Sequence, residues 1–147
     1  MYNRLDENIN LCNKNLLFIN IFSYYKQIQE DPFDTIPLTY NISSIKSPEF
    51  EEFTQNFKIK EGDASCQNIW IIKPGENSNR GQGISILKDY LEIKKLAERI
   101  DEGKSLIFQK YIENPLLINK RKFDIRCYAL ITSINGYLKG CFIRILL

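Results

Sequence analysis

Apolar residues recur along this chain with two different periods, and each change of period marks a predicted element. Leu17, Ile21 and Ile28 return at the spacing of one helix face, which predicts an amphipathic helix over residues 14–29. Asp31-Pro32 follows and should end it, because the residue before a proline disfavours helical backbone.

A second helix is expected over residues 47–57. Ser47 can cap its first turn and Pro48 suits the first helical position. The polar stretch 58–65, which contains Gly62, is predicted to be a loop. A third helix is expected over 91–100 and is stopped by Gly103.

Short runs rich in β-branched and aromatic residues predict strands. These runs are 36–42, 69–73, 84–87, 106–112, 124–133 and 137–147. The runs 69–73 and 84–87 are separated by a glycine-containing loop and should form a hairpin. Asn135-Gly136 is a strong turn signal and should join the last two strands in another hairpin.

Helices mixed with antiparallel hairpins predict an α+β fold and argue against a doubly wound parallel sheet. The order of elements indicates two small sheets, with flanking helices and a cleft between them. We expect a central region over residues 1–112 and the start of a second region over 113–147, with Glu113–Asn119 as the linker.

Charge is distributed unevenly along the chain, although the net charge is only +2. Residues 104–147 contain eight Lys or Arg and two acidic residues, so this segment carries +6. A basic segment suits an anionic ligand such as phosphate, nucleic acid or an acidic polypeptide tail. A solvated basic face explains the charge alone equally well. Nucleic acid ranks low, because only Lys120, Arg121 and Lys122 cluster and no base-reading motif is present.

Composition excludes several kinds of chemistry. The chain has no histidine, so Ser-His and Cys-His catalysis and histidine-ligated metal sites are ruled out within it. Its four cysteines lie far apart without a CxxC pair, so we expect neither zinc nor a disulfide framework. The first residues lack a signal-peptide core and no apolar run reaches membrane length. A reducing, cytoplasmic setting without membrane contact is therefore expected.

Two segments are suited to phosphate binding. Lys73 ends an apolar strand, which would fix the direction of its ammonium, although an ordinary lysine at a strand end is the commoner case. The loop 78–83 carries Gly81 and Gly83, whose backbone N–H groups could cover a triphosphate. The loop fits neither the P-loop nor the Rossmann pattern.

Two further segments present alternating side chains. In Gln109-Lys-Tyr-Ile112, free backbone groups could pair with an adenine edge, as a kinase hinge does, or the segment could be an ordinary strand. Lys122, Asp124 and Arg126 share one face at period two. We favour ligand binding there over a surface charge ladder, because Phe123, Ile125 and Tyr128 should bury the other face.

Several short sequence motifs, in their order and spacing along the chain, resemble those of the tubulin–tyrosine ligase-like family. They are Trp70-Ile-Ile-Lys-Pro-Gly75, Arg80-Gly-Gln-Gly-Ile84, Gln109-Lys-Tyr-Ile-Glu-Asn-Pro-Leu-Leu-Ile118 and Arg121-Lys-Phe-Asp-Ile-Arg126. Two upstream segments add to them, Asp31-Pro-Phe-Asp-Thr-Ile-Pro-Leu-Thr-Tyr40 and Leu11-Cys-Asn-Lys14. The resemblance covers nearly all of the chain up to about Phe142.

The resemblance implies an ATP-grasp-like ligase that uses ATP and Mg2+ to activate a carboxylate as an acyl phosphate. The amino group of glycine, glutamate or tyrosine would then attack it. The acceptor would be tubulin, held through its acidic tails, or another protein. The setting would be the cytoplasm, microtubules or cilia. The ATP-binding residues that the resemblance implies are Lys14, Lys73, Arg80, Gly81, Gln109, Lys110, Tyr111, Ile112, Lys122 and Asp124. Arg126 resembles a catalytic, substrate-side arginine.

The resemblance also sets an expectation about completeness. In the family, the carboxylates that bind Mg2+ lie downstream of the matching segment, so no metal ligand is assigned in this chain. Arg144 does not fall in the register of the family's second substrate arginine. We therefore expect a truncated ligase that contains the nucleotide-binding core. The alternative is an inactive fragment or pseudoenzyme that binds acidic tubulin tails through residues 104–147.

Overall fold

A computed structural model of the chain describes residues 8–63, 65, 67–76, 82–125, 127–134 and 136–143. The chain divides into two compact units. Ile9–Glu113 form one, called here the helix–sheet unit, and Asn114–Leu147 together with Met1–Asn8 form the other, called the hairpin unit. Helices combine with antiparallel strands in the described residues, which confirms the predicted α+β class.

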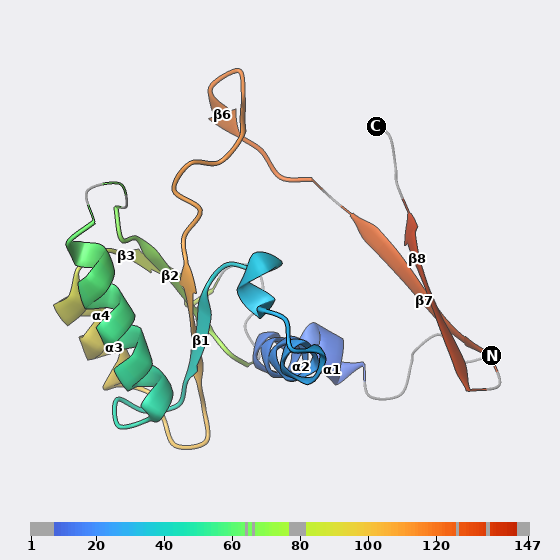
Figure 1. Ribbon diagram of the computed structural model, residues 1–147, viewed down its shortest axis with the longest axis horizontal. Coiled ribbons are helices and arrows are strands. Elements are labelled where there is room, and N and C mark those ends of the chain that lie inside the picture. The colour runs from blue at the N-terminus through green and yellow to red at the C-terminus, as the bar shows by residue number, and fades with distance from the viewer. Residues whose placement is uncertain are drawn as a thin grey trace. The chain divides into compact units, whose positions relative to one another are not determined.

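The helix–sheet unit is built on one antiparallel sheet (Figure 1). Its strands are β1 (Thr39–Ile42), β2 (Trp70–Pro74), β3 (Ser85–Leu87) and β4 (Leu106–Lys110). They lie in the order β1-β4-β2-β3. The last of these four strands along the chain, β4, therefore lies in the interior of the sheet, between β1 and β2. The predicted hairpin of β2 with β3 is confirmed, with Trp70 opposite Leu87.

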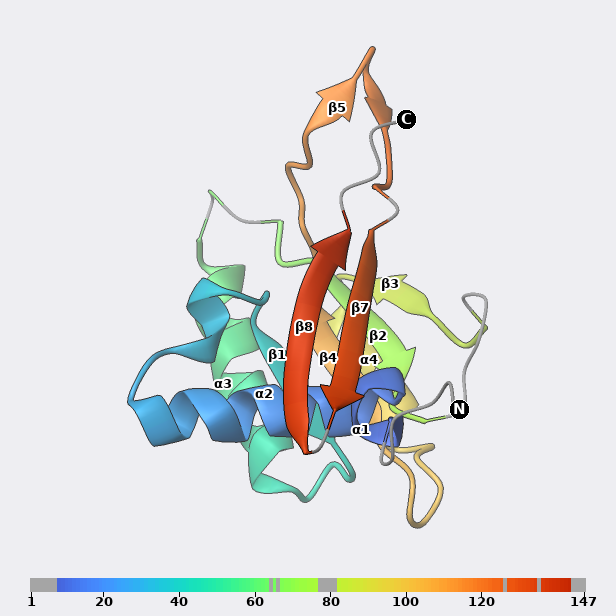
Figure 2. The ribbon, with the colours of Figure 1, turned by 90° about the vertical axis from the view of Figure 1, so that its right-hand side faces the viewer.

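Helices cover both faces of this sheet. They are α1 (Ile9–Cys12), α2 (Lys14–Ile28), α3 (Pro48–Glu61) and α4 (Tyr90–Ala97), with a 3-10 turn η1 at Pro32–Asp34. Helices α3 and α4 lie on one face and α2 on the other, as the two ribbon views agree (Figures 1 and 2). Within the described part of the chain, no helix has both the length and the apolar character needed to cross a bilayer.

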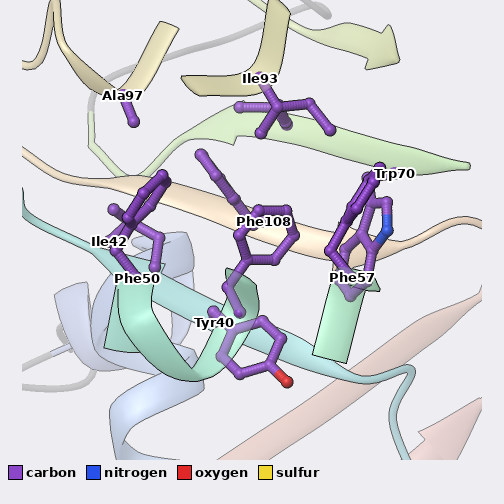
Figure 3. Close-up of a cluster of buried hydrophobic side chains, with 10 residues drawn as sticks. Tyr40, Ile42, Phe50, Phe57, Trp70, Ile93, Ala97 and Phe108 are labelled. Atoms are coloured by element: carbon purple, nitrogen blue, oxygen red, sulfur yellow. The ribbon is translucent and has the colours of Figure 1, made fainter. Parts of the chain in front are cut away.

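The core lies between the sheet and helices α3 and α4 (Figure 3). Alternate strand residues such as Trp70 and Ile72 point to this side, as the period of two requires. Phe53 of α3 is fully buried and stacks edge-on against Trp70 and Phe108, with ring centroids 4.9 and 5.0 Å apart. Ile93 of α4 is also fully buried.

Helix α3 corrects one boundary that the sequence predicted. Its start is as expected, with Ser47 Oγ accepting a hydrogen bond from the N–H of Phe50 and Pro48 in the first turn. The predicted loop over 58–65 is wrong in its first half, because the helix continues to Glu61 and ends only at Gly62. Residues 58–61 contain no helix breaker, and the buried Phe57 holds the preceding turn on the core.

The hairpin unit contains two separate strand pairs. They are β5 (Leu117–Ile118) with β6 (Arg121–Lys122), and β7 (Tyr128–Ile134) with β8 (Tyr137–Ile143). The second pair confirms the predicted final hairpin, with Ile134 opposite Tyr137. Asn135 itself lies outside the described residues.

The first of these hairpins was not predicted, since its strands lie partly in the expected linker. Asn119 and Lys120 both have positive φ, 49° and 62°, and stand between the two strands. Positive φ at both central residues is the geometry of a tight two-residue hairpin turn. Asparagine tolerates this conformation, but lysine seldom adopts it, so the sequence did not indicate the turn.

The predicted strand over 124–133 is also wrong at its start. Lys122 belongs to β6, Asp124 lies in irregular backbone, and β7 begins only at Tyr128. The apolar face expected there is not buried, since Ile125 is 75% and Tyr128 52% exposed. Alternation marks the faces of a strand, but it does not supply the second layer that burial requires.

Candidate functional site

Three polar side chains form a hydrogen-bonded row on the α2 face of the sheet. Lys73 of β2 donates from Nζ to Oε1 of Gln109 on β4, at 2.7 Å. Gln109 donates from Nε2 to Oγ1 of Thr39 on β1, at 2.9 Å, and Thr39 donates to the carbonyl of Pro37. The row crosses three strands and fixes the Gln109 amide with its oxygen toward Lys73.

Strand register is what brings these residues together. Thr39 and Ile71 both lie opposite Gln109, and Lys73 lies opposite Ile107. Residues at odd positions of the three strands therefore share the face that the core does not use. Long separations in sequence become neighbouring positions in one sheet.

Helix α2 adds a second lysine to this face. Asn13 caps the helix, because its Oδ1 accepts from the N–H groups of Asn15 and Leu16 at 2.9 and 3.1 Å, and Lys14 is the first helical residue. The N–H of Asn15 also donates to the carbonyl of Gly75, just after β2, at 3.2 Å. This bond ties the start of α2 to the strand that carries Lys73.

Lys14, Thr39, Lys73 and Gln109 line one cavity of about 200 Å³, whose remaining wall is apolar and comes half from α2. This is several times the roughly 30 Å³ that one water takes in the liquid. Burial of Lys73 and then the nearby charge of Lys14 lower the pKa of Lys73. Two cations that repel each other in a partly buried cavity favour an anion between them.

Lys110 points to the opposite face of β4 from Gln109, as alternation predicted. Its ammonium forms an ion pair with the Glu113 carboxylate and a hydrogen bond to the carbonyl of Ile69, and it stands 6.0 Å from the Trp70 ring centroid. The structure therefore does not place the Lys110 side chain in the cavity of Lys73. Its predicted role in ATP binding stays a prediction.

The backbone of the predicted adenine segment is partly occupied. The N–H of Lys110 donates to the carbonyl of Leu38 at 2.8 Å, and that of Tyr111 to the carbonyl of Ile69 at 3.0 Å. These two donors are thus not free for a base edge, contrary to the expectation from the sequence. Ile112 follows beyond the end of β4, and its side chain is 61% exposed.

The remaining predicted residues belong to the hairpin unit or fall outside the described residues. Lys122 and Asp124 are exposed residues of the hairpin unit. Arg80, Gly81 and Arg126 lie outside the described residues. The assigned roles of these five residues stay predictions.

A larger cavity of about 600 Å³ lies between the end of β2, the residues after α4 and the start of β4. It combines opposite charges, since Lys104 donates to Asp101 at 2.8 Å beside Glu76 and Arg99. Because its positive and negative side chains balance, this cavity has no preference for an anion, although it is the larger of the two. Among the described residues, no group of three acidic or cysteine side chains could hold a metal ion.

Sequence reasoning missed two residues that organise this region. Thr39 orients Gln109, and Glu113 binds Lys110 together with two backbone N–H groups. Thr39 gave no signal in the sequence, because its partner lies 70 positions away. Glu113 stands three residues after Lys110, a spacing at which two side chains can meet where the chain turns at a strand end.

The described fold is an α+β unit in which two lysines line one cavity. The sequence model of the tubulin-tyrosine ligase family matches residues 1–138. This chain belongs to the tubulin-tyrosine ligase family. The predicted resemblance is therefore confirmed.

Individual relatives are enzymes that modify tubulin. The chain is 43% identical over 102 residues to tubulin glycylase 3D of Tetrahymena thermophila, an alignment that covers 64% of the chain and 9% of that protein. It is 29% identical over 153 residues to a probable alpha-tubulin polyglutamylase of the same organism, covering 89% and 35%. With the mouse tubulin polyglutamylase TTLL11 it shares 37% identity over 103 residues, covering 67% and 14%. The chain thus spans well under two thirds of the length of these relatives.

Proposed function

We propose that the cavity of Lys14 and Lys73 binds the triphosphate of ATP in an ATP-grasp-like ligase that adds an amino acid to tubulin. The single observation that carries the proposal is the convergence of two lysines on one partly buried cavity, where burial and then the charge of Lys14 lower the pKa of Lys73. Such a pair is unfavourable when empty and favourable with a polyanion, because the anion relieves the repulsion.

The residues of this cavity would bind and orient. Lys73 is held by Gln109, so its ammonium keeps one direction and neutralises phosphate charge without being reorganised. Lys14 begins a 15-residue helix, whose macrodipole adds positive potential at the same place. Charge neutralisation and positioning are the main protein contributions to phosphoryl transfer.

ATP, with Mg2+, would supply a phosphoryl group that converts an acceptor carboxylate into an acyl phosphate and releases ADP. The amino group of a free amino acid would then attack the acyl carbon, expel phosphate and lose a proton, which leaves an amide bond. Glycine and glutamate are proposed because named relatives are glycylases and polyglutamylases, and tyrosine because of the family's name. Tubulin is proposed as acceptor on the same ground. A cytoplasmic location at microtubules or cilia follows from that acceptor.

The remaining predicted residues keep proposed roles. Arg80 and Gly81 would cover the phosphates, the segment Gln109 to Ile112 would hold the adenine, and Lys122 and Asp124 would contact the nucleotide. Arg126 would bind the acceptor carboxylate. The +6 charge of residues 104–147 suits an acidic tubulin tail.

Nucleotide binding tests the cavity directly. Isothermal titration of the full chain with MgATP should show at least about tenfold weaker binding for Lys73→Ala, since one charge-assisted contact contributes about that much. Lys14→Ala should also weaken it. Lys26→Ala is the matched control, a lysine in the last turn of the same helix. Equal affinities in all four proteins would overturn the assignment.

Activity separates the ligase from the alternative of a tail-binding module, which the basic segment favours. The chain is incubated with MgATP, labelled glycine or glutamate, and microtubules. Incorporation into tubulin supports the ligase. Salt-sensitive pelleting with microtubules without incorporation supports the module, because ion pairs with acidic tails weaken as salt rises.

A further inference from the structure

We infer that Glu113 is a positioning residue that fixes the backbone segment Tyr111–Ile112, so that this segment can hold the base of a bound nucleotide. The inference rests on the proposed nucleotide site. It concerns a residue that contacts neither of the two lysines of that site.

The Glu113 carboxylate receives donors from two different parts of the chain. Its Oε2 accepts from the N–H of Gln67 at 2.8 Å, and its Oε1 accepts from the N–H of Ile69 at 3.0 Å and binds the Lys110 ammonium. The Glu113 side chain is only 11% exposed. The carboxylate therefore joins the entry of β2 to the exit of β4.

The loop 67–69 is shaped to bind a carboxylate. Asn68 has a positive φ of 52°, which turns the N–H groups of its two neighbours toward one point. Asn68 is itself fixed, since it donates to the carbonyl of Phe57 at 3.0 Å and accepts from Nε1 of Trp70 at 2.9 Å. The binding point for Glu113 is thus anchored to the core of the unit.

Electrostatics agrees with this geometry. Burial of Glu113 opposes its ionisation, but the N–H of Ile69, the Lys110 ammonium and the N–H of Gln67 outweigh it and lower the pKa of Glu113 to about 2. The carboxylate is consequently charged throughout the physiological range, and the attachment does not switch with pH.

These contacts restrict the backbone of Tyr111 and Ile112, which lie between Lys110 and Glu113. Lys110 is bound before them and Glu113 after them, and the N–H of Tyr111 bonds to the carbonyl of Ile69. In the described part of this segment, the N–H of Ile112 makes no hydrogen bond, so it is the donor left for a base, and it lies between the bound residues Tyr111 and Glu113. Glu113 is also the last residue of the helix–sheet unit. It therefore fixes the place where the chain leaves that unit.

The test compares two ligands that differ in the base. MgATP should contact both the lysine cavity and the Tyr111–Ile112 segment, whereas inorganic tripolyphosphate should contact the lysine cavity alone. Glu113→Gln keeps the size of the side chain but removes the charge. We expect it to weaken ATP binding about tenfold and to change tripolyphosphate binding less than about twofold. The control is Glu92→Gln, an exposed carboxylate on α4, which should change neither.

The outcomes separate this inference from the proposed function. Lys73→Ala should weaken both ligands in parallel, and if it weakens neither, the proposed function fails. If Glu113→Gln weakens both ligands equally, or neither, the positioning role fails, because loss of folded protein alone keeps their ratio unchanged.

A measurement on the unaltered chain covers the case in which Glu113→Gln does not fold. ATP, but not tripolyphosphate, should slow hydrogen exchange of the Gln67 and Ile69 amides, because a base held at Tyr111–Ile112 stabilises the Glu113 attachment. Equal exchange with both ligands would overturn the inference.

Discussion

Lys73 and Gln109 are joined side chain to side chain at 2.7 Å across strands β2 and β4, although 36 positions separate them in sequence. The amide holds the lysine toward the cavity that Lys14 also lines. A lysine with a fixed direction, a lowered pKa and a second cation nearby has properties that follow from its position in the fold.

Anion binding should weaken as pH rises, and earlier than for an ordinary lysine site. The pKa of Lys73 lies below its usual 10.5, so the ammonium is lost at lower pH than usual. Tripolyphosphate affinity measured by calorimetry should therefore begin to fall below pH 10.5. Lys73→Arg, which stays protonated, should move the fall to higher pH.

Without a ligand, the stability of the chain should rise over the same pH range in which anion affinity falls. Between the lowered folded pKa of Lys73 and the unfolded value of 10.5, the unfolded chain binds more protons, so the free energy of unfolding gains a contribution that rises with pH. Urea unfolding with and without Lys73→Met isolates that contribution. Identical pH slopes for the two proteins would contradict the lowered pKa.

Lys14→Met should raise the pKa of Lys73 while it weakens anion binding. Burial is the larger cause of the lowered pKa of Lys73 and stays in place, but removing the nearby positive charge takes away the second cause, so the pKa moves part of the way back toward its usual value. NMR titration of the lysine side chains measures this shift directly. Lys26→Met, in the last turn of the same helix, should leave the Lys73 titration unchanged.

Acid should destabilise the chain partly through Glu113. Its folded pKa of about 2 lies below the ordinary 4.5, so its stabilising contribution is complete above pH 4.5 and is lost as pH falls toward 2. Glu113→Gln should unfold more readily at neutral pH and depend less on pH across that window. Denaturant midpoints at pH 3 and pH 7 provide the measurement, and an unchanged difference between them would count against the attachment.

Phe53→Ala should lower the free energy of unfolding by about 3–5 kcal/mol, the usual cost of truncating a buried phenylalanine. The Phe53 ring is fully buried and contacts both Trp70 and Phe108. Urea denaturation followed by tryptophan fluorescence reports on the same contact. Ile59→Ala on the same helix is the control, because Ile59 is 74% exposed and should change stability by less than about 0.5 kcal/mol.

Gly75→Ala should destabilise the chain by about 1–3 kcal/mol through steric overlap. An added Cβ would overlap Oγ of Ser105 and stand 3.3 Å from Cβ of Asn15. Because Asn15 follows Lys14, anion binding should weaken as well. Ser105→Gly should restore part of the loss. Gly62→Ala is the matched control, since its Cβ would meet only a backbone oxygen at 3.7 Å.

Local signals in the sequence predicted most of the helix–sheet unit. Ser47 and Pro48 gave the start of α3, and the apolar period gave α2 within a residue of its end. These signals act over one or two helical turns, so they are readable without the fold. The same reasoning extended a loop through residues 58–61, where the absence of a helix breaker should have outweighed the polar composition.

The hairpin unit was harder to predict because its short strands carry little local signal. Asn119 and Lys120 form a tight turn with positive φ at both residues, and the turn contains no glycine that would have predicted it. Residues 124–133 alternate like a half-buried strand, yet Ile125 is largely exposed. Alternation gives the faces of a strand but does not supply the layer that buries one of them.

The sequence by itself determined the family, the α+β class and the lysines that are candidates for nucleotide binding. These depend on sequence motifs and on hydrophobic periodicity within short segments. Only the tertiary structure decided which candidates meet. Antiparallel register puts Lys73 beside Gln109 and Thr39, and turns Lys110 to the other face, where Glu113 binds it. Register depends on contacts between distant strands, and a one-residue shift would send each side chain to the opposite face.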